Sequence, residues 1–300
     1  MTRGENRFGA RYRLTTGHLL ILGAAIMWST SGLFAKSPVF SDWPIMGPQL
    51  AIRGPLLAFW RALFACVILI PLVRRPRWTV KLIPAVLVFA LMNFTFLTAL
   101  TTTTAANAIW LQYTAPVWVF LFGAFFLREP IQHRDWLMLG FALAGIGLIL
   151  AFEGRDQTWV GVVYGLSAGL CYAGVVLTLR WLRDEDAAWL VALNHFVTAA
   201  LFFPFVVITE IWPSYHQWSY LVGFGVLQMG IPYLLFARGL RTVAGHEASL
   251  VVLLEPVLVP LWVFLAWRSE ADYQPPAIWT LGGGLLILCG LLARYVPWKR

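Results

Sequence analysis

Ten long apolar runs restrict the fold of this chain more than any other feature. A helix needs about 20 mostly apolar residues to cross the roughly 30 Å hydrocarbon core of a bilayer. Of the 300 residues, 60% are hydrophobic and 12% are charged, whereas a soluble domain has about 25% charged residues. We therefore predict an all-α integral membrane protein embedded in the lipid bilayer, and we exclude a soluble enzyme. The runs cover residues 17–36, 55–73, 82–100, 106–127, 136–152, 160–181, 188–208, 218–237, 247–267 and 277–296.

The distribution of Lys and Arg predicts how these ten transmembrane helices are oriented. Of the 22 basic residues, 17 fall on one side of the membrane and four on the other, while Arg61 lies inside a helix. Loops on the cytoplasmic side are enriched in Lys and Arg. We therefore expect the N-terminal segment 1–16 and the C-terminal segment 297–300 to be cytoplasmic, in a protein of the inner membrane. The net charge of +8 then reflects topology and does not indicate nucleic acid as a partner.

The chain also repeats itself. A shift of 140 residues matches Phe96 with Phe236, and a shift of 144 matches Trp28 with Tyr172. Each half contains five spans, and because five is odd the second half enters the membrane from the opposite side. Inverted repeats of this kind are common in transporters, with the binding site near the membrane midplane between the repeats. The two inverted five-helix repeats are expected at residues 17–152 and 160–296.

Nothing in the sequence predicts a cofactor or a metal site. The cysteines Cys66, Cys171 and Cys289 all lie within apolar runs, so we expect neither a disulfide framework nor a cluster of metal ligands. The chain also lacks the phosphate-binding motif G-x-x-x-x-G-K-[ST], which a nucleotide-driven pump would need. We therefore expect no cofactor and no direct coupling to nucleotide hydrolysis.

Three segments resemble a known family. They read FWRALFACVILIPL at 59–72, LQYTAPVWVFLFGAFFLREP at 111–130 and LLEPVLVPLWVFLAW at 253–267. They are similar to the second, fourth and ninth helices of EamA-type transporters of the drug/metabolite transporter superfamily. The resemblance implies ten helices in two inverted repeats, a central cavity lined chiefly by helices 1, 3, 4, 6, 8 and 9, and alternating access that exports small metabolites such as amino acids. The loop 37–54 is longer than the family pattern.

Glu255 is the ionisable residue of greatest interest. Placing an ionisable side chain inside a membrane span costs free energy, and such residues usually face a cavity or the bundle interior. One interpretation is a carboxylate that couples transport to protons or binds a substrate amine. The alternative is a structural, protonated side chain bonded to backbone that Pro256 and Pro260 leave unpaired. Its repeat mate is Ala115, so the repeat itself does not require a carboxylate.

Two further ionisable residues are expected to act in gating or coupling, together with Glu255. Arg61 could reach the outer face beside Arg53, or it could pair with a carboxylate or with the substrate. We favour a structural or gating role for it. His195 could respond to pH, and the alternative is a buried histidine that only packs between helices.

Neutral polar and aromatic residues predict a pocket at the midplane. Trp110 and Tyr113 are three residues apart, which places them on one face of a continuous helix. Such a pocket suits a small amphipathic solute, particularly an aromatic or apolar amino acid, although each residue could equally serve only in helix packing. The predicted substrate-binding residues are Trp28, Asn93, Trp110, Tyr113, Tyr172, Gln228, Tyr233 and Glu255.

These features together predict a secondary transporter that exports a small-molecule substrate, with amino acids as the leading class and protons as a further partner. A flippase for lipid-linked carriers and a passive metabolite facilitator are alternatives that share the fold. An intramembrane enzyme is a remote alternative, since it needs paired catalytic groups and only Glu255 and His195 offer a pair.

Overall fold

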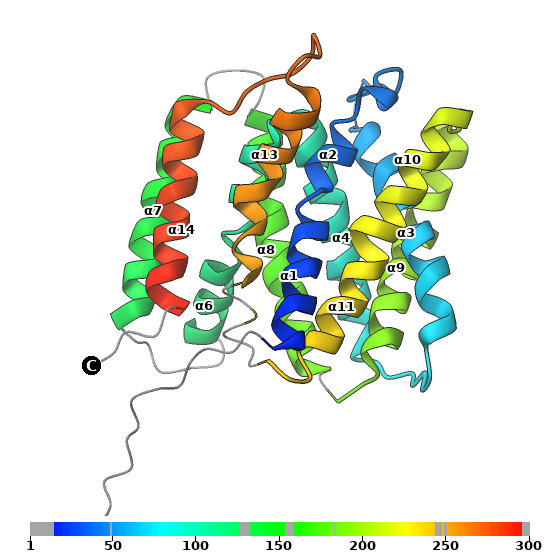
Figure 1. Cartoon of the computed structure of the whole chain (residues 1–300), viewed down its shortest axis with the longest axis horizontal. Helices are drawn as coiled ribbons and strands as arrows, with labels where there is room; N and C mark the ends of the chain where they lie inside the picture. Colours follow the sequence, from blue (N-terminus) through cyan, green and yellow to red (C-terminus); the bar gives the residue numbers. More distant parts are fainter. Residues whose placement is uncertain are drawn as a thin grey trace, which may run out of the picture.

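The computed structural model is a bundle of helices that run roughly parallel or antiparallel to one another (Figure 1). It describes residues 15–48, 50–125, 133–153, 159–182, 184–243, 248 and 251–295. The helical elements are α1 (Thr16–Trp28), α2 (Ser31–Ala35), η1 (Pro38–Phe40), α3 (Arg53–Leu69), η2 (Ile70–Leu72), α4 (Leu82–Thr102), α5 (Ala105–Gln112), α6 (Ala115–Phe125), α7 (His133–Glu153), α8 (Trp159–Trp181), α9 (Ala187–Thr209), α10 (Tyr215–Gly225), η3 (Val226–Gly230), α11 (Ile231–Gly239), α13 (Glu255–Trp267) and α14 (Ile278–Tyr295).

These helices confirm the predicted all-α membrane fold. In the described part of the chain, eight apolar helices are long enough to cross a membrane, and two shorter apolar helices follow at Glu255–Trp267 and Ile278–Arg294. Each predicted run coincides with one of these ten segments, which we number as spans 1 to 10 in chain order. The predicted start of the ninth run at residue 247 lies outside the described residues.

Span 1 is interrupted by hydroxyl side chains that bond back to the preceding turn. The Ser29 hydroxyl donates to the carbonyl of Ile26 and the Thr30 hydroxyl to that of Met27, each at 2.6 Å. Such bonds compete with the helix ladder and often bend it, and α1 ends here before α2 begins. The indole N–H of Trp262 donates to the Ser29 hydroxyl at 2.8 Å, so the break also anchors span 9.

Spans 4 and 9 are broken at positions that are 140 residues apart. In span 4 the N–H of Thr114 donates to Leu111 at 3.2 Å, and in span 9 the N–H of Leu254 donates to Val251 at 3.1 Å. A proline follows each turn by two residues, at Pro116 and Pro256. Because a proline has no N–H to donate, it leaves a carbonyl of the preceding turn without its usual donor.

The packing of the helices follows the same two-fold relation. Span 1 packs on span 8 (α1 with α11), and span 3 packs on span 6 (α4 with α8). Span 2 packs on span 7 (α3 with α9), and span 5 on span 10 (α7 with α14). Exchanging each span with the one five places away turns the first two pairs into each other and leaves the last two unchanged. The two halves are therefore interleaved, and they do not form separate lobes.

Two glycines allow α7 and α14 to pack with their backbones in contact. A Cβ atom at Gly283 would lie 2.7 Å from the carbonyl oxygen of Gly145, closer than any side chain can approach. Small residues at such crossings let transmembrane helices pack closely. The same pair of helices is joined by an ion pair between Arg294 and Asp135, with a nitrogen–oxygen distance of 2.6 Å.

The long loop between spans 1 and 2 is folded onto the end of the bundle opposite to the start of α1 (Figure 1). It contains η1 and an isolated antiparallel bridge between Met46 and Ala51. Trp43 is buried there, and the guanidinium of Arg53 donates to its carbonyl. The Gln217 amide of α10 donates to the Asp42 carboxylate at 2.7 Å. The loop thus forms an ordered cover rather than a helix entering the membrane.

Asp186 ties two spans together at the other end of the bundle. Its carboxylate caps α9 by accepting from the N–H of Ala188 at 2.9 Å, and it also accepts from the N–H groups of Arg74 and Arg75 at 3.1 Å. Burial alone would raise the pKa of this carboxyl, but the backbone donors outweigh burial and hold its pKa below the ordinary value.

We expect Asp186→Asn to remove stability that depends on pH. Because the pKa of Asp186 is lower in the folded state, its contribution is present above the ordinary pKa of aspartate and is lost as pH falls through the folded value. Because asparagine caps a helix about as well as aspartate, the loss at neutral pH should be well below the roughly 1 kcal/mol that removal of a cap costs, and it should come from the lost charge. Melting temperatures in detergent between pH 3 and pH 7 measure this, with exposed Glu270→Gln as the control. Identical pH curves for wild type and Asp186→Asn would contradict the assignment.

Candidate functional site

A cavity of about 460 Å³ lies between spans 1, 2, 3, 4, 6, 8 and 9. Six of these are the spans that the family resemblance implies, and span 2 adds Arg61. Seven of the ten residues singled out from the sequence line this cavity: Trp28, Arg61, Tyr113, Tyr172, Gln228, Tyr233 and Glu255. Asn93, Trp110 and His195 do not belong to the lining.

Positions related by the internal repeat face this cavity together. Five such pairs line it: Phe96 with Phe236, Gln112 with Val252, Tyr113 with Leu253, Ala115 with Glu255, and Trp28 with Tyr172. The first four pairs are 140 residues apart and the last is 144 apart. The cavity therefore lies where the two halves of the chain meet.

Arg61 is held by amide side chains from two other spans. Its guanidinium donates to the Asn93 side-chain oxygen in α4 and, at 3.3 Å, to the Gln228 side-chain oxygen in η3. The Gln228 amide in turn donates to the carbonyl of Trp28 at 3.1 Å. The ring of Phe224 lies 5.1 Å from the guanidinium carbon. Four spans thus meet at this one side chain.

Arg61 is buried deep within span 2. Arg61 follows the start of α3 at Arg53 by eight residues, which is about 12 Å along a helix, and it is 2% exposed. It therefore does not reach the outer face beside Arg53. Within the described part of the chain, no carboxylate lies within 4 Å of the guanidinium.

Gln228 owes its position to an irregular turn in span 8. The segment Val226–Gly230 is π-helical, and the N–H of Ile231 donates to the carbonyl of Val226, five residues earlier. Pro232 follows at once and has no N–H for the carbonyl of Gln228. Single π turns often mark functional sites, and here the extra residue in the turn directs Gln228 toward Arg61.

The hydroxyl group of Tyr113 lies within hydrogen-bond distance of both the Glu255 carboxylate and a backbone carbonyl. The Tyr113 oxygen lies 2.8 Å from a Glu255 carboxylate oxygen and 3.0 Å from the carbonyl oxygen of Val252. A hydroxyl has a single proton to donate. An ionised Glu255 can accept that proton, whereas a protonated Glu255 can donate its own proton and leave the tyrosine to bond with Val252. The arrangement therefore accommodates both protonation states of Glu255.

Aromatic rings form one wall of the cavity. The Trp28 ring centre lies 5.1 Å from that of Tyr233 and 5.1 Å from that of Phe236. His195 lies behind this wall, with its ring 6.0 Å from Tyr233 and 4.9 Å from Phe89. Both ring nitrogens of His195 are buried without a hydrogen-bond partner, so the structure gives His195 a packing position next to the wall.

Trp110 does not line the cavity, although the Tyr113 N–H still donates to the Ile109 carbonyl at 3.0 Å and the two residues keep helical spacing. α5 ends at Gln112, and Tyr113 already belongs to the turn before α6. Three residues along a helix still separate two side chains by about 60°, which is enough for them to face different neighbours. Trp110 instead packs against the backbone of Gly284 in α14, leaving no room there for a Cβ atom.

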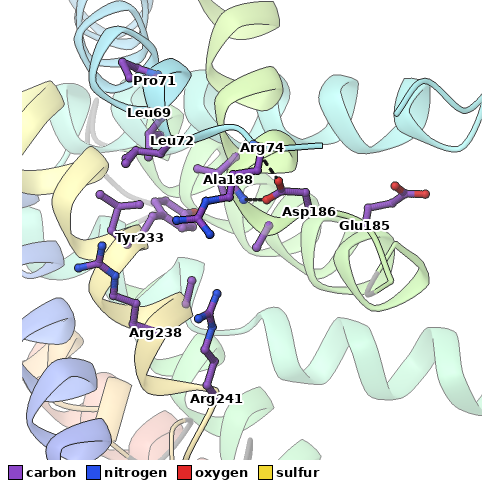
Figure 2. Close-up of a pocket in the computed structure, with 14 residues that line it drawn as sticks. Leu69, Pro71, Leu72, Arg74, Glu185, Asp186, Ala188, Tyr233, Arg238 and Arg241 are labelled. Carbon is purple, nitrogen blue, oxygen red and sulfur yellow. Dashed lines mark hydrogen bonds between the residues drawn. The ribbon is translucent and has the colours of Figure 1, made fainter. Parts of the chain in front are cut away.

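A second cavity of about 670 Å³ opens at the end of the bundle where α1 begins. Figure 2 shows Arg74, Arg238 and Arg241 around Tyr233, with Asp186 nearby and Glu185 pointing away from the arginines. Tyr233 is the one residue that belongs to the described linings of both cavities. Its side chain therefore forms part of the partition between them.

Several cavity residues were missed in the sequence, among them Phe96, Phe236, Gln112 and Met229. The repeat offered a signal for the two phenylalanines, because they match each other at the same shift that relates Ala115 to Glu255. Met229 had no such signal, since its place depends on the π-helical turn.

The sequence matches one protein-family model in both of its halves. The model of the EamA-like transporter family matches residues 15–151 and again residues 159–295. The chain belongs to the EamA-like transporter family. It is accordingly a multi-pass membrane transporter that takes a small-molecule substrate, and the intramembrane enzyme considered from the sequence is not supported.

Individual EamA relatives are distant. An uncharacterized transporter of Archaeoglobus fulgidus is 24% identical and covers 94% of this chain and 96% of its own length. The threonine/homoserine exporter RhtA of Salmonella typhimurium is 27% identical over 56% of each chain. The pseudopaline exporter CntI of Pseudomonas aeruginosa is 25% identical over 63% of this chain and 65% of its own. A solved crystal structure with 18% identity matches 93% of this chain with a TM-score of 0.62, which shows the fold alone.

Proposed function

We propose that this protein exports small metabolites across the inner membrane by alternating access, and that amino acids, especially aromatic or apolar ones, are its main substrates. The observation that carries the proposal is the cavity between the two halves, whose lining combines Arg61 and Glu255 with two glutamine amides and a majority of aromatic and apolar side chains. A site with one group of each charge and a mainly apolar remainder suits a zwitterion with a hydrophobic side chain.

The size of the cavity and the named relatives support this proposal. Its volume of about 460 Å³ falls within the roughly 300–1,000 Å³ typical of small-molecule sites. RhtA is named as an exporter of threonine and homoserine, which are amino acids, and CntI is named as an exporter as well. Transport outward is therefore the direction that we propose here.

The proposed movement is a rocking of the repeats 17–152 and 160–296 about the cavity between them. The breaks in spans 4 and 9 lie beside the cavity and supply places where each half can bend. With both termini in the cytoplasm, as the Lys and Arg distribution predicts, the second cavity is the cytoplasmic entrance and Tyr233 is part of the inner barrier. Arg74, Arg238 and Arg241 would then attract substrates that carry a negative group.

Protons are the proposed driving ion, with Glu255 as the group that carries them. The Tyr113 hydroxyl can serve either protonation state of this carboxyl, as described above. In an exchange cycle, the substrate amine binds the ionised carboxylate of Glu255. The substrate then leaves when a proton from the opposite side of the membrane protonates this carboxylate. Substrate then accumulates in the more acidic compartment.

Transport by the purified protein in liposomes tests the proposal. We expect labelled phenylalanine, leucine or a similar amino acid to accumulate in vesicles with an acidic lumen, and to show little accumulation when both sides have equal pH. Rates that are independent of pH and of membrane potential would instead indicate a passive facilitator. If no amino acid is transported, the substrate assignment fails, and lipid-linked carriers become the next substrates to test.

A further inference from the structure

Several N–H donors of Arg61 form no hydrogen bond with the surrounding protein. A guanidinium has five N–H donors, and two bonds are formed here, to Asn93 and Gln228. The Nε atom is buried and has no partner, although the side chain is only 2% exposed. Buried donors are normally satisfied, and one without an acceptor is destabilising.

The positive charge of Arg61 also forms no direct ion pair with a carboxylate of the described residues. The two amide oxygens provide dipoles but no charge, and the ring of Phe224 contributes a weak cation–π contact at 5.1 Å. Along the described lining of the cavity, the one carboxylate is Glu255, which is engaged by Tyr113 instead. A buried cation is strongly unfavourable without a partner of opposite charge. The guanidinium thus presents both an unmatched charge and an unmatched donor to the cavity.

We propose that Arg61 is the residue that binds the carboxylate of the substrate, so that only solutes with a free carboxylate bind tightly. The planar guanidinium fork matches a carboxylate with two parallel hydrogen bonds. Asn93 and Gln228 hold its plane from spans 3 and 8 and take one N–H of each terminal nitrogen, which leaves the Nε–H and the second N–H of each terminal nitrogen as donors for a carboxylate. This inference deepens the proposed function: together with Glu255, it specifies α-amino acids and excludes simple amines.

A series of ligands that share one ring tests this inference in the wild-type protein. Binding of phenylalanine, phenylalanine methyl ester, phenethylamine and 3-phenylpropanoate is measured by thermal stabilisation of the purified transporter and by displacement of labelled phenylalanine. We expect phenylalanine to bind about 10- to 100-fold more tightly than the ester or the amine, as for the loss of a charge-assisted hydrogen bond. We also expect 3-phenylpropanoate to bind more tightly than its own uncharged methyl ester, which completes the series.

Variants of Arg61 separate recognition from folding. In Arg61→Gln, the ratio between the affinities for phenylalanine and phenethylamine should fall to about one, while Arg61→Lys should keep part of the preference. If Arg61 has a purely structural role, the substitution should weaken the binding of both ligands equally and leave the ratio of their affinities unchanged. Arg268→Gln, which changes an exposed arginine at the end of α13, serves as the control.

The outcomes separate this inference from the proposed function. If the wild type binds neither carboxylate compound more tightly than its carboxylate-free counterpart, the assignment of Arg61 is overturned, even if transport is observed. If nothing is transported but the carboxylate preference is present and lost in Arg61→Gln, the binding site stands and the proposed transport cycle fails. Because binding is measured without transport, the ligand series gives an answer in either case.

Discussion

Replacing Glu255 with glutamine is expected to abolish the accumulation of substrate that a pH gradient drives. Glutamine has nearly the same shape but cannot take up or release a proton. If one proton exchanges for one substrate, each pH unit supports about tenfold accumulation, since one unit corresponds to about 1.4 kcal/mol. In Glu255→Gln the ratio should return to one, measured with labelled substrate in vesicles with an acidic lumen. The other ionisable groups that line this cavity, namely Arg61, Tyr113, Tyr172 and Tyr233, remain unchanged in the variant.

Tyr113→Phe provides the matched control for this result. It keeps the ring and removes the hydroxyl that bonds to Glu255 and faces Val252. Because the carboxyl itself remains, we expect gradient-driven accumulation to persist, with a shifted pH dependence of its rate. Exchange of labelled for unlabelled substrate should survive in Glu255→Gln at equal pH, but at higher substrate concentrations, because the carboxylate that binds the substrate amine is replaced by a neutral amide. Undiminished accumulation in Glu255→Gln would show that the carboxyl is structural and that the transporter is not coupled through it.

The second large effect concerns the crossing of α7 and α14. Gly145→Val is expected to prevent these helices from packing, because a Cβ atom there would lie 2.9 Å from the Ile287 side chain and even closer to the carbonyl oxygen of Gly283. Overpacking usually costs about 1–3 kcal/mol, and backbone cannot move aside as a side chain can. We therefore expect at least about 3 kcal/mol of lost stability, seen as a loss of monodisperse protein after mild heating.

Gly147→Val on the same helix is the matched control. A Cβ atom at Gly147 meets nothing within 4 Å, and the position is exposed on the surface of the bundle. The same substitution should therefore leave the melting behaviour of the purified protein nearly unchanged. Equal melting of the two variants would show that the close crossing of α7 and α14 does not contribute to stability.

The membrane spans could be predicted because apolar length is a local property of the sequence. The breaks inside the spans were harder to predict, since Ser29 and Thr30 interrupt span 1 without a proline. Trp110 shows another limit, because spacing along a helix does not tell which neighbouring helix a side chain meets, and Trp110 meets α14. The repeat could have identified more of the cavity than it did, since the matched pair Phe96 and Phe236 lines it from both halves.

The partners of Arg61 could not be predicted from the sequence. Its depth in the span marked it as unusual, but its hydrogen-bond partners lie 32 and 167 residues away along the chain. Which helices meet at one depth depends on packing that no local pattern encodes. The π-helical turn adds to this difficulty, because it changes the direction of Gln228 by inserting one residue into a turn. Sequence reasoning could therefore name the polar residues but not the network that they form.

The unequal pairs around the cavity carry a consequence for the empty transporter. In the proposed alternating-access cycle, two halves of identical sequence would make the inward-facing and outward-facing forms equivalent by a two-fold rotation, so the forms would have the same free energy and be equally populated. The pairs Ala115 with Glu255 and Tyr113 with Leu253 break this equality. A free-energy difference of a few kcal/mol between two forms leaves the minor one at a few per cent or less. If the protein works by the proposed alternating access, sequence differences between the halves such as these determine which of the two forms predominates in the absence of substrate.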